Sequence, residues 1–175
     1  MSLVSFPSDP SPRLWALSQI EAARSYTLEL VASVPTEHWF TMPGGCPTHV
    51  AWQVGHLAMA EYGLCLFRQR GRLPDDLHLM PSSFRKLFSR QSQPSAAASD
   101  YPPPEEILAT LHRVHAQVRL EVPQFAESDL RQPAEPPYAV EPTRLGSLLF
   151  CAHHEMLHGG QIGLLRRMLG YPPLH

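Results

Sequence analysis

The chain has 175 residues, 43% of them hydrophobic, so we expect one domain, spanning residues 1–175, with a sizeable core. Fourteen basic and sixteen acidic residues give a net charge of −2, which excludes the basic surface of a typical nucleic-acid-binding protein. Because no apolar run reaches the roughly 18–20 residues of a membrane span and Met1 to Arg13 lack a signal-peptide pattern, we predict a cytoplasmic protein with no membrane partner.

The first half of the chain predicts two long helices. Apolar residues recur at helical spacing over residues 12–34, where Pro12 suits a first helical turn and Pro35 ends the pattern. The same spacing predicts a second helix over residues 48–70. Thr48 is a suitable N-cap for it, and Gly71 is a suitable left-handed stop.

Residues 72–102 are rich in proline and too irregular for one long element. A connection of this length usually crosses the fold or covers a site. We expect a short helical turn around Phe84 to Phe88 within it, and these two aromatic rings are candidates for closing over a binding pocket.

The second half predicts two further helices, over residues 104–121 and 144–169. The first starts with a proline and two acidic residues, which favour a helix N-terminus, and the last has Thr143 as its N-cap and Gly170 after its end. No segment alternates in the manner of a strand. Four amphipathic helices without strands predict an all-α four-helix bundle, a fold that builds its sites from side chains on facing helices.

A pair of histidines in the last helix predicts a metal site. His154 and His158 are four positions apart, so their Cβ atoms lie about 5–6 Å from each other on one helix face. The third ligand that we predict is His56, which interrupts an apolar face of the second helix, where a polar ring needs a partner. The alternative is a core histidine bonded to a backbone carbonyl. Three imidazoles with an open fourth position favour zinc, with nickel or ferrous iron as alternatives.

Residues 154–158 also read as H-E-x-x-H, the helix signature of zinc peptidases. Peptidase activity is disfavoured because neither an acidic third ligand nor a sheet follows this helix, and Gln161 and Leu164 replace the glycine and histidine of the extended motif. Glu155 lies about 100° round the helix from His154 and is a candidate catalytic residue, at a metal-bound water or behind a ligand. The alternative is a charged residue on the solvent side of the helix.

Other polar residues are candidates for supporting roles. His49 and Gln53 share the helix face of the third ligand, and Gln53 is the better candidate for a hydrogen bond to a ligand. His112 and His115 form a rival ligand pair at i, i+3, although a polar helix face explains them more simply. His153 points about 100° away from its neighbouring ligand, so we expect it at the surface or in a dimer contact.

In combination, the histidine motifs resemble the DinB / YfiT-like metalloenzyme superfamily. The resemblance rests on Trp52-Gln53-Val54-Gly55-His56-Leu57, His154-x-x-x-His158-Gly159-Gly160-Gln161-Ile162 and Leu165-Arg166-Arg167-Met168-Leu169-Gly170. It implies a four-helix bundle with a long crossover between helices two and three, a divalent metal held by His56, His154 and His158, and a homodimer. Where many relatives carry a basic residue after the second ligand of the last helix, this chain has Gly159.

The resemblance also implies a class of chemistry. Known members include transferases that depend on low-molecular-weight thiols such as bacillithiol or mycothiol, and a thiol-dependent maleylpyruvate isomerase. Our first hypothesis is therefore a metal-dependent transferase or hydrolase acting on a small-molecule substrate, with or without a thiol co-substrate. The alternative is a non-catalytic metal- or ligand-binding bundle whose ion ties the second helix to the last. A bundle that has lost its metal is disfavoured by the intact ligand set.

Overall fold

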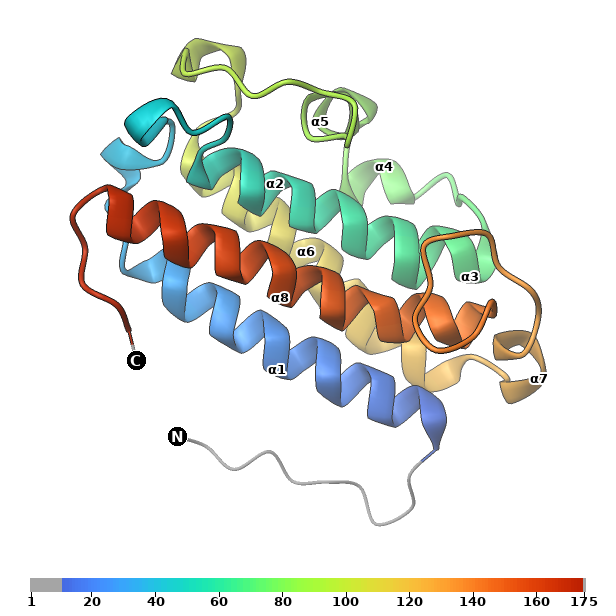
Figure 1. Ribbon diagram of the computed structural model, residues 1–175. Coiled ribbons are helices and arrows are strands. Elements are labelled where there is room, and N and C mark those ends of the chain that lie inside the picture. Colours follow the sequence, from blue (N-terminus) through green and yellow to red (C-terminus); the bar gives the residue numbers. More distant parts are fainter. Residues whose placement is uncertain (1–10, 175) are drawn as a thin grey trace.

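Four long helical rods form the body of the protein in the computed structural model, which describes residues 11–174 (Figure 1). The first, third and fourth rods are single α-helices, whereas the second consists of three consecutive helical segments. The rods are α1 (Pro12–Ala32), the second rod of α2 (Val50–Glu61), η3 (Tyr62–Phe67) and α3 (Arg68–Arg70), α6 (Pro104–Glu121), and α8 (Arg144–Met168). With no strand among the described residues, the predicted all-α class is confirmed.

Short helical turns fill the connections between the rods. The connection from α1 to α2 holds η1 (Thr36–His38) and η2 (Pro43–Gly45). The later connections hold α4 (Asp76–Leu79), α5 (Ser82–Leu87), η4 (Ala98–Asp100), η5 (Val122–Gln124) and α7 (Glu127–Leu130). The turn expected around Phe84 to Phe88 is thus present as α5.

Most predicted helix ends agree with the structure. The bounds of α6 are those predicted, Thr143 caps α8 by accepting a hydrogen bond from the Gly146 amide at 3.1 Å, and Gly71 has a positive φ of 78°. The predicted cap of the second rod is wrong. Its N-cap is His49, whose Nδ1 accepts a hydrogen bond from the Trp52 amide at 3.1 Å, so α2 begins two residues later than expected.

The second rod contains a π-helical stretch at Tyr62–Phe67, where the sequence predicted ordinary α-helix. A π-helical stretch adds a residue to the turn, and such stretches occur often beside functional sites. Apolar periodicity does not distinguish a π-helix from an α-helix, because in both forms apolar residues occupy the positions that face the core.

The rods run in two directions, which the connections explain (Figure 1). α1 and α8 run the same way and pack against each other, while α2 and α6 run the opposite way as a second packed pair. Because α2 and α6 are parallel, residues 71–103 must return along the bundle to start α6, and Figure 1 shows them passing over α2 through α4 and α5. The predicted long crossover is therefore confirmed.

A network of charged side chains lies inside this helical core. Arg24 of α1 is 2% exposed and donates from Nη2 to Glu61 of the second rod at 2.8 Å and from Nε to Glu155 of α8 at 2.5 Å. His115 of α6 bonds to the other oxygen of Glu61 at 2.7 Å. One side chain from each rod thus meets at the centre of the bundle. Buried charges need such partners because isolated ones are costly.

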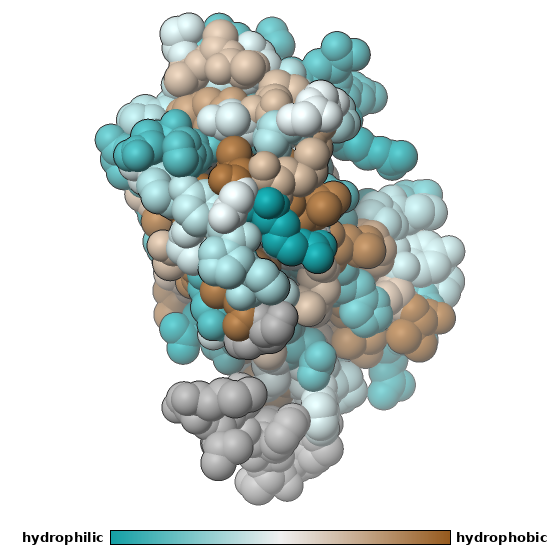
Figure 2. Space-filling model, turned by 60° about the vertical axis from the view of Figure 1, so that its left-hand side comes forward, coloured by the Kyte–Doolittle hydropathy of each residue, from teal (hydrophilic) through white to brown (hydrophobic). Residues whose placement is uncertain are grey.

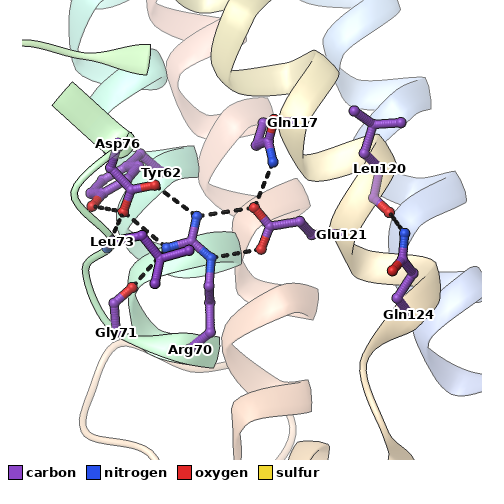
Figure 3. Close-up of polar contacts among 9 residues, drawn as sticks. All are labelled: Tyr62, Arg70, Gly71, Leu73, Asp76, Gln117, Leu120, Glu121 and Gln124. Atoms are coloured by element: carbon purple, nitrogen blue, oxygen red, sulfur yellow. Dashed lines mark hydrogen bonds and ion pairs between the residues drawn. The ribbon is translucent and has the colours of Figure 1, made fainter. Parts of the chain in front are cut away.

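A second ionic contact fixes the point where the crossover leaves the second rod (Figure 3). Arg70 donates to Asp76 of α4 at 2.8 Å and to Glu121 of α6 at 2.6 Å. The hydroxyl of Tyr62 also donates to Asp76, at 2.8 Å. These contacts tie the first turn of the crossover to two rods of the bundle.

The surface shows no extended apolar face on the side drawn in Figure 2, where hydrophobic residues form separate patches between hydrophilic ones. Within residues 11–174, none of the helices is both long and apolar enough to cross a membrane.

Candidate metal centre

The structure brings together the three histidines that the sequence selected. His56 comes from α2, and His154 and His158 come from consecutive turns of α8. One ring nitrogen from each lies within 4.8 Å of the other two. The Nε2 atoms of His154 and His158 are 3.2 Å apart, and the ring centroid of His56 is 5.3 Å and 4.8 Å from those of His154 and His158.

His56 is oriented by the crossover. Its Nδ1 lies 2.8 Å from the backbone oxygen of Phe88, and because a carbonyl oxygen can only accept, Nδ1 carries the proton. The lone pair of Nε2 is then free to bind a cation. The ring also stacks on Trp52, with centroids 4.7 Å apart and planes inclined by 9°, and the indole nitrogen of Trp52 donates to Ser92 at 3.0 Å.

His158 is oriented by Gln53. Its Nδ1 donates to the Oε1 atom of Gln53, while the Nε2 of Gln53 donates to Thr48 at 3.0 Å. Gln53 is 1% exposed, so this contact is shielded from water. The prediction that Gln53 bonds to a candidate ligand is confirmed. As with His56, an outer hydrogen bond leaves Nε2 available to bind a metal, which is the usual arrangement of histidines around metal sites.

Burial keeps the three imidazoles neutral. Desolvation, with a smaller contribution from the neighbouring rings, lowers the pKa of His154 to about 4 and that of His158 to about 3. Burial also lowers the pKa of His56, against the opposing effect of its bond to Phe88. Neutral imidazole is the form that coordinates metals, so the site is ready for a cation at neutral pH.

The geometry of these nitrogens fits a divalent ion. Two histidine nitrogens bound to one tetrahedral zinc at about 2.0–2.1 Å lie about 3.3 Å from each other. The observed Nε2 separation of 3.2 Å in the His154–His158 pair is close to that value. An all-imidazole donor set is compatible with zinc, nickel and ferrous iron.

A cavity of about 430 Å³ lies next to the cluster. His56 and His154 form part of its wall, and the π-helical stretch of the second rod contributes Gly63 and Leu64. The other lining residues are Met59, Ala60, Arg68, Arg90, Pro137 and Phe150. A small molecule in this cavity would therefore lie beside two of the three candidate ligands.

Glu155 is not part of the cluster. Its carboxylate accepts hydrogen bonds from the Nε and Nη2 atoms of Arg24, at 2.5 and 3.0 Å, and the residue is 1% exposed. The alternative that placed Glu155 on the solvent side of α8 is wrong. Its position also gives no support to a role at the metal, because both oxygens are bound to the guanidinium in the bundle core.

The remaining histidines lie outside the cluster as well. His49 is fully buried as the cap of α2, against the rings of Phe40 and Tyr101. These contacts do not orient any of the three candidate metal ligands. His115 bonds to Glu61, and the rival His112–His115 pair does not belong to the group of potential ligands found among the described residues. His153 is exposed on α8, as expected for a surface position.

Sequence reasoning missed the contacts that orient His56, although two signals were available. Trp52 precedes His56 by four positions, which places both on one helix face. Gly55 is a poor helix former, and a Cβ atom built there would lie 2.5 Å from Cγ of Phe88. The glycine therefore makes room for the crossover to dock, which brings the Phe88 carbonyl to His56.

Comparison with known proteins gives a family for the chain. No curated protein matches it closely enough to be reported. A sequence model described as the DinB superfamily matches residues 19–162, a segment that contains all three candidate ligands, the whole crossover and most of α1 and α8. The matched segment is most of the 175 residues, and the chain belongs to the DinB superfamily.

Proposed function

We propose that this protein is a metal-dependent enzyme that acts on a small molecule at the three-histidine site. The observation that carries the proposal is the convergence of three imidazole nitrogens within 4.8 Å beside a cavity of about 430 Å³. An ion with a purely structural role needs no adjoining cavity, whereas a catalytic ion needs a position that the substrate can reach.

The candidate metal ligands and the residues that orient them would have separate roles. His56, His154 and His158 would hold the ion, while Phe88 and Gln53 keep the Nδ1 protons of two rings away from it. When bound, the ion would lower the pKa of a coordinated water or thiol and so supply a nucleophile at neutral pH. The apolar cavity wall would position the substrate and exclude bulk water.

The nucleophile would be either an external thiol or water. Cys65 and Cys151 are both buried, and burial raises the pKa of the Cys65 thiol. Neither residue lines the cavity, and neither does Cys46, the third cysteine. A thiol-dependent transfer would therefore need a low-molecular-weight thiol as co-substrate, and the water route would give a hydrolase. We propose zinc as the ion, with nickel or iron as alternatives.

Metal analysis of the purified protein tests the proposal. After dialysis we expect about one divalent ion per chain in the wild type and none in His154→Ala. His153→Ala is the matched control, because this neighbouring histidine is exposed and should leave metal content unchanged. Loss of metal in both variants, or no metal in the wild type, would contradict the proposal.

Turnover separates an enzyme from a metal-binding bundle. The ligands come from α2 and α8, so an ion that merely ties these helices together would raise the unfolding temperature without supporting a reaction. We expect the metal-loaded protein, but not His154→Ala, to consume an electrophilic substrate in the presence of a thiol, or to hydrolyse it without one. Stabilisation by metal with no turnover of any electrophile would favour the non-catalytic alternative.

The proposal includes a cytoplasmic homodimer. Leu157, Leu164 and Met168 lie on one face of α8 at spacings of seven and four, and they remain 63%, 49% and 43% exposed. A second copy could cover this stripe. Sedimentation analysis should give twice the chain mass for the wild type and the chain mass for Leu157→Arg.

A further inference from the structure

The cavity beside the histidine cluster is mostly apolar but has positive charge in its wall. Its apolar surface comes from Met59, Leu64, Pro137 and Phe150 among others. The described side chains that line it include two guanidinium groups and no aspartate or glutamate. This combination differs from a typical protein surface, where charges of both signs alternate.

The guanidinium of Arg68 forms hydrogen bonds that stabilise the fold. Its Nη2 donates to the carbonyl of Pro136 at 2.6 Å, and its Nη1 donates to Glu135 and, at 2.8 Å, to Pro137. These bonds hold the loop before α8 against the second rod. The donors of this guanidinium are therefore mostly occupied by backbone oxygens, although its charge still contributes to the field in the cavity.

Arg90, three residues after the end of α5, differs from Arg68. It is exposed, lines the cavity, and forms no hydrogen bond or ion pair with another residue of the described part of the chain. Its planar donors are thus available to a ligand. A guanidinium of this kind matches a carboxylate, which it binds through two parallel hydrogen bonds.

We propose that the cavity selects small carboxylates with an apolar body, and that Arg90 binds the carboxylate while the body packs on Phe150 and Met59. This inference rests on the proposed function, for which it names the substrate class. The absence of acidic side chains from the described lining removes the repulsion that an anion would otherwise meet. The apolar body would then lie beside His56 and His154.

Calorimetric titration with two matched probes tests the inference. 3-Phenylpropionate carries the charge, and 3-phenylpropanamide has nearly the same shape without it. We expect the wild type to bind the carboxylate about tenfold or more tightly than the amide, since hydrogen bonds to a charged group contribute on this scale. Arg90→Gln should abolish this preference. Arg131→Gln, which removes an exposed arginine outside the cavity, should retain it.

Repeating the titration after chelation separates Arg90 from the metal. If Arg90 binds the carboxylate, the preference survives removal of the ion, and Arg90→Gln keeps the metal content of the wild type. A preference that disappears on chelation, persists in Arg90→Gln or is lost equally in Arg131→Gln would overturn the inference, as would binding of neither probe. Failure of the chain to retain metal would overturn the proposed function but leave the Arg90 result intact.

Discussion

The Nδ1 atom of His56 lies 2.8 Å from the backbone oxygen of Phe88, so a ligand candidate on α2 takes its orientation from the crossover. The crossover is therefore part of the candidate metal site as well as a connection between rods. Gly55 makes this contact sterically feasible because its missing side chain leaves room for the Phe88 ring. A substitution at Gly55 or at Phe88 should therefore change the affinity of the site for a metal.

Gly55→Ala should weaken both the fold and the site. The added Cβ would lie 2.5 Å from Cγ of the buried Phe88 ring, and overpacking of this kind costs about 1–3 kcal/mol of unfolding free energy. Denaturant unfolding and metal titration should both show the loss. Gly160→Ala is the control, since a Cβ there meets nothing within 4 Å, and that variant should be neutral or more stable by up to about 1 kcal/mol.

Gln53→Ala should lower metal affinity by about 10–100-fold, because His158 loses the acceptor that fixes its Nδ1 proton. Gln53→Glu keeps an acceptor oxygen and should restore most of the affinity. Gln69→Ala is the matched control: this buried glutamine bonds to backbone oxygens of Leu64 and Arg144, so its loss should reduce stability without changing affinity. Unchanged affinity in Gln53→Ala would mean that the contact does not position His158.

Glu155→Ala should destabilise the fold by about 3–5 kcal/mol, because it leaves Arg24 with one of its two buried carboxylate partners. The metal content of the folded protein should stay at the wild-type value. Glu155→Gln keeps an acceptor for Arg24 and serves as the milder variant if the alanine form does not fold. A folded Glu155→Gln protein that cannot retain metal would restore Glu155 as a residue of the site.

The free energy of unfolding should decrease in acid because the carboxylate of Glu61 becomes protonated. Burial alone would raise the pKa of this carboxyl, but Arg24 and His115 outweigh it and hold the pKa below the ordinary value of 4.5. The unfolded chain then binds more protons than the folded one as pH drops, so the contribution of Glu61 is present above pH 4.5 and is lost below it.

Unfolding free energies measured from pH 7 to pH 3 should show this loss. Glu61→Gln should flatten the acid limb of the curve, because the titrating group has been removed. Glu21→Gln removes a carboxylate from a more exposed pair with Arg119 and should keep the wild-type slope. Equal slopes in the two variants would show that the buried pair does not govern acid stability.

Periodicity and spacing were sufficient to predict much of the architecture and the histidine cluster. Apolar recurrence and proline placement located α1, α6 and α8 to within two residues, because helix ends depend on local chemistry. The His154–His158 pair could be predicted as two neighbouring ligands because i, i+4 spacing places both side chains on one helix face. His56 could be selected because a polar residue on an apolar helix face needs a partner.

The interior polar network could not be predicted in the same way. Glu155 is adjacent to a candidate ligand in the sequence, yet it faces Arg24, and only the mutual rotation of α1 and α8 decides this. The cap of α2 was misassigned because Thr48 and His49 can both accept a hydrogen bond from a helix amide. The actual assignment depends on Gln53, which takes the hydroxyl of Thr48 as its own acceptor.

The meeting of Arg24, Glu61, His115 and Glu155 fixes how the four rods align along their length. If α8 slid by one turn, Glu155 would lose Arg24, and an unpaired charge would remain in the interior. The same setting of α8 places His154 and His158 opposite His56, so the alignment that pairs the charges also assembles the ligands. This network needs no ion, and none of its four residues lines the cavity beside the histidines, so a substitution at an exposed lining residue such as Arg90 can change which molecules the cavity accepts while the rods stay aligned.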